Sequence, residues 1–306
     1  MTTIVAEPAV STEASPVDVH VTKKKGLGFT GWLAAGWLIL IIGSAILAPI
    51  LPLDDPNAQV APKRFAPLQG TGPILGADAN GRDLLARTIY GARVSLVIAF
   101  AAVMIGFVIG GFLGLLAGYF RNWAGNALVS LFDILLAIPQ LVLALSLVAV
   151  LKGDPTSDDG FKLPVELTLI IALGIVSIPL LARITRASTL SWSQREFVLA
   201  ARAQGATHWR ILVREVLPNV LPAMVSIALL GMAVAIVAEG GLAILGASVE
   251  PPQATWGTMI ASGQSELQTA PFIVWIPIFA VFATAASLNF LGDVMRERFD
   301  VRESAL

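Results

Sequence analysis

The sequence predicts an all-α membrane protein with six transmembrane helices. Of its 306 residues, 56% are hydrophobic and only 13% are charged, so the chain is more apolar than an average soluble domain. The charges are also unevenly placed, because long stretches of the chain contain none. A helix that crosses about 30 Å of hydrocarbon needs about 20 apolar residues, and stretches of that length are therefore predicted to be spans.

Five stretches without charge meet this test, and they are residues 26–53, 94–120, 134–151, 216–238 and 267–292. A sixth, shorter span is expected at 167–182. It reaches full length if the Arg183 and Arg186 side chains extend to the interface.

The distribution of basic residues predicts that both termini are cytoplasmic. With the N-terminus inside, 13 of the 20 lysines and arginines fall on the inner side and 7 on the outer side, as the positive-inside rule requires. The 28-residue run at 26–53 is long for a signal peptide, so we expect an uncleaved anchor. The segments are a disordered cytoplasmic tail at 1–28, the first transmembrane helix at 29–51, an external segment at 52–92, a five-helix core at 93–293 and a cytoplasmic tail at 294–306.

Two loops of this arrangement are predicted to contain short helices. In the external segment, residues 82–93 place Leu84, Leu85 and Ile89 on one face, which predicts an amphipathic helix on the outer membrane surface. The cytoplasmic loop 188–218 is predicted to form a helix at 196–205, with Pro218 at the entry to the next span. A second external loop is expected at 249–271.

Glycines recur every four residues in the second span, at Gly106, Gly110, Gly114 and Gly118. This period places all four on one helix face, where small residues let another helix backbone approach closely. The pattern therefore predicts a packing surface, although glycine is also generally frequent in membrane helices.

Two acidic residues lie within the predicted spans. Asp133 is interpreted as either a carboxylate near a helix terminus or a packing or gating residue. Glu239 precedes Gly240 and Gly241, where the helix could break and expose backbone donors. A structural network and a substrate contact both remain possible roles for Glu239.

The composition excludes several classes of function. The net charge of −1 provides no basic surplus for a nucleic-acid partner, and no lysine follows a glycine as in an ATP-binding Walker loop. There are no cysteines, and the two histidines, His20 and His208, fall in different segments, which argues against a metal site. A membrane aspartyl protease using Asp133 and Asp293 lacks the expected glycine, because Phe290 occupies that position.

Four groups of residues resemble the C-type permease subunit of dipeptide/oligopeptide ABC importers, a branch of the type I binding-protein-dependent permeases. One is Leu-Gly-Ala-Asp-Ala-Asn-Gly-Arg-Asp at 75–83 with Tyr-Gly-Ala-Arg-Val-Ser-Leu at 90–96. The others are an EAA-like loop at 196–205 followed by Leu-Pro-Asn at 217–219, the stretches 239–246 and 250–257, and Asn-Phe-Leu-Gly-Asp at 289–293. The sequence departs from the family pattern at Leu199, Glu215 and Val301.

This resemblance implies a type I importer fold, a bacterial cytoplasmic-membrane location and a non-catalytic role. It implies as partners a B-type permease, two ATP-binding subunits that carry ATP and Mg, and an extracytoplasmic substrate-binding protein, with no cofactor bound by this chain. Coupling to the ATP-binding subunits is assigned to Glu196, Ala200, Ala201, Arg202, Gly205 and Pro218. The external segment has two possible roles, to cover the outer face of the permease or to dock the binding protein, and the candidate docking residues are Asp78, Asn80, Arg82 and Asp83.

Three functions are weighed on this basis. A permease for peptides is favoured, with nickel complexes or haem as alternative substrates of the same family. A stand-alone secondary transporter would show inverted repeats and carboxylates at the membrane midplane, and neither is evident in the sequence. A membrane enzyme would need a nucleophile or metal constellation, for which we find no candidate.

Overall fold

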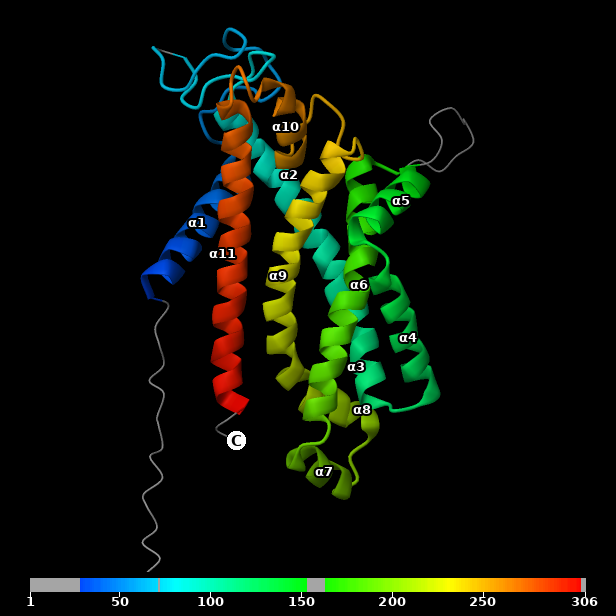
Figure 1. The fold of residues 1–306 in the computed structure, drawn as a ribbon. Helices are drawn as coiled ribbons and strands as arrows, with labels where there is room; N and C mark the ends of the chain where they lie inside the picture. Colours follow the sequence, from blue (N-terminus) through cyan, green and yellow to red (C-terminus); the bar gives the residue numbers. More distant parts are fainter. Residues whose placement is uncertain (1–27, 71, 153–162, 304–306) are drawn as a thin grey trace, which may run out of the picture.

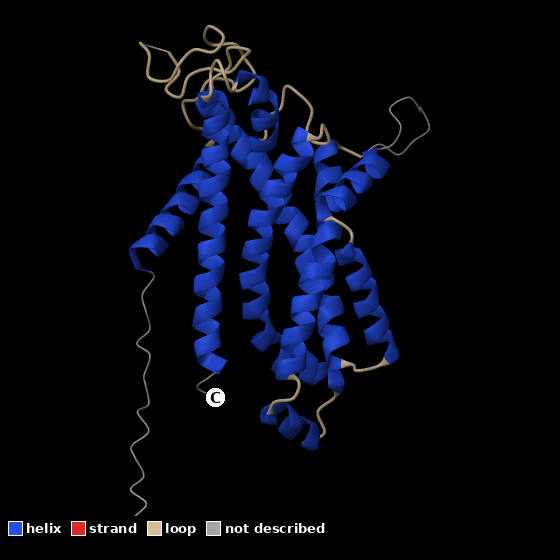
Figure 2. Ribbon diagram, in the orientation of Figure 1, coloured by secondary structure: helices blue, strands red, loops and turns tan. Residues whose placement is uncertain are grey.

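The computed structural model describes residues 28–70, 72–152 and 163–303, in which all the long regular elements are helices (Figures 1 and 2). In chain order they are α1 (Gly28–Leu47), α2 (Leu84–Ile105), η1 (Gly106–Gly110), α3 (Gly111–Tyr119), α4 (Trp123–Ala137), α5 (Gln140–Lys152), α6 (Val165–Trp192), α7 (Glu196–Ala203), α8 (His208–Ile211), η2 (Leu212–Val216), α9 (Leu217–Ile244), α10 (Trp256–Gly263), η3 (Gln264–Glu266) and α11 (Phe272–Glu303).

Six membrane spans follow from these helices. Five are long and apolar enough individually: α1, the continuous α2–η1–α3 helix, α6, the continuous α8–η2–α9 helix, and α11. The sixth is the pair α4 and α5, which passes the same test only when taken together. The predicted all-α fold with six transmembrane helices is confirmed.

The third span differs from the straight helix expected at 134–151. It is broken between α4 and α5, whose axes differ by 94°. Proline disfavours the helical conformation in the residue before it, and Ile138, which precedes Pro139, is extended with φ −80° and ψ 131°. The break therefore follows from the position of Pro139, and Asp133 lies in α4 before it.

The amphipathic surface helix expected at 82–93 is not formed as a separate element. Residues from Leu84 onward are the first turns of α2, which continues without interruption to Tyr119. Ala86, Arg87 and Thr88 are buried there, because α10 covers this part of α2 (Figure 1). The polar character of the segment thus reflects contacts with loops and α10.

The remaining spans pack around α6 and α9. α6 contacts both α2 and α3, while α9 contacts α11, and α1 lies against α11 and α2. α6 extends well beyond the expected 167–182. It runs from Val165 to Trp192 and thus includes Arg183 and Arg186. α11 also continues through most of the tail expected at 294–306, whereas the tail expected at 1–28 lies almost entirely outside the described residues.

The two ends of the helix bundle carry different structures. We call them the α10 end, which includes the segment 48–83 and α10, and the α7 end, which includes the α7–α8 turn (Figure 1). The loop expected at 249–271 contains the two short helices α10 and η3, which the sequence did not reveal.

Candidate functional site

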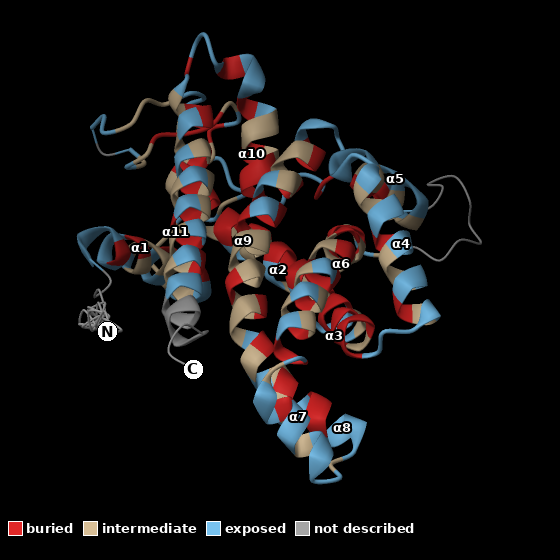
Figure 3. Ribbon diagram, turned by 60° about the horizontal axis from the view of Figure 1, so that its bottom comes forward, coloured by how far each residue is buried: buried red, intermediate tan, exposed pale blue. Residues whose placement is uncertain are grey.

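The short helix predicted in the loop 188–218 is present as α7. It begins at Glu196 and ends at Ala203, two residues before Gly205, which has φ +81°. This left-handed conformation favours glycine and directs the chain into α8, where the Thr207 side chain accepts a hydrogen bond from the Arg210 N–H at 3.4 Å. The α7–α8 turn projects from the α7 end of the bundle (Figure 3).

The two faces of α7 have different environments. Val198 is completely buried, and partly buried Ala201 packs on the same apolar cluster as Trp192, Ile211 and Leu212. Ala200 and Arg202 are exposed, as are the apolar side chains of Phe197, Leu199 and, on α8, Trp209. Of the two alanines to which coupling is assigned, Ala200 is therefore exposed, whereas Ala201 packs against the end of the bundle.

Polar and aromatic contacts join the α7–α8 turn to the end of α3. Tyr119 Oη lies 3.0 Å from His208 Nδ1, and the Arg202 guanidinium carbon lies 5.4 Å from the centre of the Tyr119 ring, within the range of a cation–π interaction. Sequence reasoning missed Tyr119 because it is 89 positions from His208. These contacts connect α7 to the span that carries the glycine series.

Pro218 is exposed at the beginning of α9, but it does not mark the start of the membrane helix. α8, η2 and α9 form one continuous helix from His208 to Ile244. Proline cannot donate a backbone hydrogen bond, and the turn directly before Pro218, η2, is a π-helical turn.

The four glycines at 106–118 face α6 along its length. A Cβ atom at Gly110 would lie 2.5 Å from the Ile178 carbonyl oxygen, and one at Gly118 would lie 2.7 Å from Thr189 Cβ. Cβ atoms at Gly106 and Gly114 would meet Ser177 and Ala182 more closely still. The glycines thus allow α6 to approach the backbone of the η1–α3 segment.

Replacing Gly114 with Leu is expected to prevent this approach and to lower the stability of the chain. The new Cβ would overlap the backbone carbonyl of Ala182, which cannot move without displacing α6. We expect a loss of several degrees in the midpoint of thermal unfolding in detergent. Gly36→Leu is the matched control, because no atom lies within 4 Å of a Cβ at Gly36. Equal unfolding midpoints for the two variants would contradict the packing role.

Glu239 occupies the centre of a buried hydrogen-bond network at the α10 end. Its side chain is fully buried and accepts hydrogen bonds from Ser248 Oγ at 2.9 Å, Thr255 Oγ1 at 2.7 Å and Ser95 Oγ at 3.3 Å. The backbone N–H of Gly257 also bonds to it. The helix break expected at Gly240 does not occur, since α9 continues to Ile244, and the backbone donor comes from α10.

This network joins two of the groups of residues on which the family resemblance rests, the one that includes 90–96 and the one formed by 239–246 and 250–257. Ser95 Oγ, besides donating to Glu239, accepts a hydrogen bond from the Trp256 backbone N–H at 3.1 Å, and Trp256 Nε1 donates to the Thr88 carbonyl at 3.0 Å. The polar residues of α2 therefore hold the first turn of α10. Of the two roles left open for Glu239, its hydrogen bonds support the structural one.

Asp133 is placed differently from Glu239. It is exposed on α4, in the third turn of that helix and four residues before its end at Ala137. Asp133 is therefore not at a helix N-terminus, where the helix dipole would stabilise a carboxylate.

Asp78 and Asp83 are buried and support the local fold of the α10 end. Asp78 Oδ2 accepts a hydrogen bond from Arg82 Nε at 2.7 Å, and Asp78 Oδ1 accepts the Asn80 and Arg82 backbone N–H groups. Asp83 is the N-cap of α2, accepting the backbone N–H groups of Leu85 and Ala86. Of the four candidate docking residues, Asn80 is exposed, Arg82 is partly buried, and Asp78 and Asp83 are buried.

An ion pair fixes the segment 48–83 to the region around η3. Arg64 Nη2 lies 2.9 Å from Glu266 Oε1, and Thr269 Oγ1 donates to Glu266 Oε2 at 2.9 Å. The hydrogen bonds from Arg64 and then from Thr269 hold the pKa of Glu266 below its usual value. No local sequence signal pairs these residues, which are 202 positions apart.

We expect the segment around Arg64 to loosen in acid. Because the pKa of Glu266 is lowered in the folded protein, the stabilisation by the ion pair is complete above the usual carboxyl pKa of 4.5 and is lost as the pH falls through the lowered pKa. The Ala77 amide donates to the Phe65 carbonyl at 2.8 Å, and its protection against hydrogen exchange, relative to the intrinsic exchange rate at each pH, should fall over this pH range. Glu266→Gln should lower the same protection at neutral pH, and unchanged protection in that variant would exclude the ion pair as the cause.

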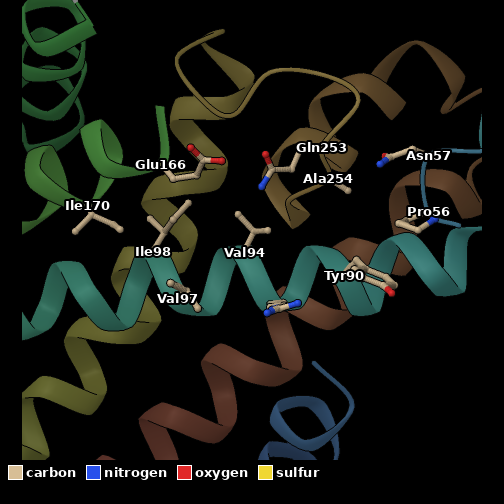
Figure 4. Close-up of a pocket in the computed structure, with 11 residues that line it drawn as sticks. Pro56, Asn57, Tyr90, Val94, Val97, Ile98, Glu166, Ile170, Gln253 and Ala254 are labelled. Carbon is tan, nitrogen blue, oxygen red and sulfur yellow. The ribbon is translucent and has the colours of Figure 1, made fainter. Parts of the chain in front are cut away.

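A cleft of about 460 Å³ opens at the α10 end between α2, α6 and the loops. Figure 4 shows Val94 and Ile98 rising from α2 toward Glu166 and Gln253, with Asn57 and Pro56 on the far side. The cleft also includes the basic side chain of Arg93. It therefore combines apolar side chains with charged groups of both signs.

A second cavity, of about 380 Å³, is partly open to the surface and is lined by residues of the membrane-spanning helices. Its walls come from α2, α5, α6, α9 and α11, and most of its lining side chains are apolar. Gln140, Ser177 and Asn289 are the polar side chains in this lining, which contains no charged residue. Asn289 is the first residue of the run at 289–293 that resembles the family, and no local pattern indicates that it lines a cavity.

Comparison with known proteins gives concordant matches. Residues 106–303 match the family model described as the binding-protein-dependent transport system inner membrane component. A di/tripeptide transport system permease protein of Pseudomonas aeruginosa is 36% identical over 269 residues, covering 86% of this chain and 85% of that protein. A glutathione transport system permease protein of Pectobacterium atrosepticum is 32% identical over 269 residues, covering 88% of this chain and 86% of that protein.

A solved structure supports the same fold. A chain of the MetNI methionine ABC transporter in an inward-facing conformation aligns with a TM-score of 0.57 at 19% sequence identity. The alignment covers 69% of this chain and 95% of the other.

Proposed function

The chain belongs to the family of binding-protein-dependent transport system inner membrane components, and from this premise we propose that it is a permease subunit of a bacterial ABC importer for dipeptides and oligopeptides. It resides in the inner membrane and crosses it several times. The peptide class rests on relatives described as di/tripeptide, dipeptide and peptide permeases, which are 30–36% identical to it.

The observation that carries this proposal is the exposed helix α7 at one end of a helical bundle. α7 presents Phe197, Leu199 and Ala200 outward, while Val198 and Ala201 fix it to the apolar cluster at the ends of the spans. A separate ATP-binding subunit can grip such a helix and move the spans with it. Glu196 and Arg202 are also exposed on α7, where they can form polar contacts around that apolar centre.

The proposed complex has four types of subunit. This chain pairs with a B-type permease, two ATP-binding subunits bind ATP and Mg, and a substrate-binding protein delivers the peptide to the opposite face. The chain itself has no catalytic role and binds no cofactor. We place the α7 end and the C-terminus in the cytoplasm and the α10 end outside, in line with the positive-inside rule.

Purification and reconstitution test this proposal. The tagged chain should co-purify with a second permease and ATP-binding subunits, and proteoliposomes of the complex should accumulate a radiolabelled dipeptide only with ATP and the binding protein. Uptake by this chain alone without ATP would overturn it. Uptake of a nickel complex or haem but not of peptides would retain the permease and overturn the peptide class.

The orientation has a separate test. A reporter that is active only in the cytoplasm, fused after Leu306, should be active, and the same reporter inserted near the exposed residue Ala58 should be inactive. The reverse pattern would exclude the proposed topology.

A further inference from the structure

We propose that Gln140 and Asn289 form a binding site for the main chain of the transported peptide at membrane depth. This inference rests on the proposed function, because it assigns a peptide contact within the permease. Both residues line the cavity of about 380 Å³ described above, whose volume lies within the range of roughly 300–1,000 Å³ typical of small-molecule sites.

The two amides differ from the third polar side chain of the cavity in having no internal partner. Ser177 Oγ donates to the Gly174 carbonyl at 2.7 Å and also lies 3.3 Å from the Ala102 carbonyl. Within the described part of the chain, the side-chain amides of Gln140 and Asn289 form no hydrogen bond, and both residues are exposed. Their hydrogen-bonding groups are thus available to a molecule in the cavity.

Their depth makes this availability significant. Gln140 is the first residue of α5, directly after the break in the third span, and Asn289 lies within the membrane-spanning part of α11. A side-chain amide in an apolar medium loses the hydrogen bonds that water would supply, and this loss is costly unless another polar group replaces them. Lipid chains offer these side-chain amides no hydrogen-bond partner. The partner must therefore be water, a passing substrate or another polypeptide.

The chemistry of the lining favours a peptide main chain over other ligands. A side-chain amide offers both a donor and an acceptor, so it can pair with the carbonyl and the N–H of a peptide group. The lining carries no charged residue to select a charged side chain, and its apolar surface comes from residues such as Leu141, Val176 and Val234. Such a site holds peptides of many sequences weakly, as passage requires.

The cavity is lined by helices from different parts of the bundle. Gln140 of α5 and Ser177 of α6 line it on one side of α9, and Asn289 of α11 lines it on the other side. α11 is fixed to α9 by the buried hydrogen bond from Ser226 Oγ to the Gly292 carbonyl at 2.6 Å. A shift of α5 relative to the α9–α11 pair would therefore change the separation of the two amides.

Photocrosslinking in the complete reconstituted complex tests the site. A benzophenone amino acid is placed singly at Leu141 and at Ala285, which line the cavity and leave both amides intact, and, as a matched control, at Val142, which is exposed on α5 but does not line the cavity. During ATP-driven uptake of radiolabelled trialanine, label should attach to the chain from 141 and 285 at least five times more than from 142. Crosslinks from 141 and 285 only to the second permease or to lipid would overturn the inference.

Substitutions give a second readout that does not depend on crosslinking. Asn289→Leu and Gln140→Leu should lower the rate of trialanine uptake about tenfold, while Asn289→Gln and Gln140→Asn, which keep the amide, should recover most of it. Rates equal to the unsubstituted complex in both Leu variants would also reject the site. In either case, ATP-dependent uptake by the unsubstituted complex tests the proposed function separately.

Discussion

The Ala200→Trp variant is expected to insert into the membrane normally and to lose peptide uptake completely. Ala200 is exposed at the centre of α7, so an indole ring there meets nothing within this chain. In the complex it would hold α7 away from the groove of the ATP-binding subunit that we propose for it. Loss of this contact removes the route by which ATP binding moves the spans.

Two measurements check this expectation. The quantity of tagged chain in the membrane should equal that of the unsubstituted protein, and the ATP-binding subunits should no longer co-purify or should hydrolyse ATP without uptake. Ala58→Trp, at an exposed alanine of the α10 end, is the control and should retain uptake. Normal uptake by Ala200→Trp would refute the coupling role of this face.

Gly205→Leu extends the test to the orientation of α7. Gly205 has φ +81°, and no atom lies within 4 Å of a Cβ placed there, so the only penalty is the left-handed backbone, about 1–2 kcal/mol for other residues. We expect the chain to leave α7 in a different direction, so that uptake falls sharply although the fold persists. Undiminished uptake would show that the direction of this turn is unimportant.

Glu239→Leu is expected to produce the largest loss of stability. The substitution leaves the hydroxyls of Ser248 and Thr255 and the N–H of Gly257 without their acceptor in a buried site. Each buried donor without a partner costs about 1–3 kcal/mol, so the total is on the order of 3 kcal/mol or more. We expect α10 to detach from α2 and α9, with a lower midpoint of thermal unfolding in detergent.

Two further variants distinguish a network from a general effect of removing a carboxylate. Glu239→Gln keeps one acceptor oxygen and should lose less stability than Glu239→Leu. Glu250→Gln removes an exposed carboxylate, whose Oε1 lies 2.7 Å from Lys152 Nζ in an ion pair. Exposed ion pairs contribute about 0–1 kcal/mol to the free energy of unfolding. A loss in Glu250→Gln equal to that in Glu239→Leu would contradict the network.

Local sequence patterns predicted the features of the fold that depend on neighbouring residues. The charge-free stretches located all six spans because the length of an apolar helix and the thickness of the bilayer are directly related. α7 was predicted because its segment is polar, lacks proline and precedes Gly205. The glycine series predicted a packing face because its period of four coincides with one helix face.

The errors arose where distant residues determine the structure. The segment 82–93 has an amphipathic pattern, but α10 covers it, and α10 is held there by Trp256 and Ser95, which are 161 positions apart. Gly240 and Gly241 mark a place where α9 could break, but the helix continues through both residues to Ile244. Ala201 was assigned to coupling together with Ala200, but it packs against the cluster that contains Trp192 and Ile211, which no local pattern indicates.

The break after Ile138 changes what holds the third span in place. α4 has 15 residues and α5 has 13, and at 1.5 Å per residue each is only about 20 Å long, too short to cross the bilayer alone. Both halves contact α6, a helix of 28 residues. The third span is thus a pair of half-membrane helices that share one full-length helix as their support.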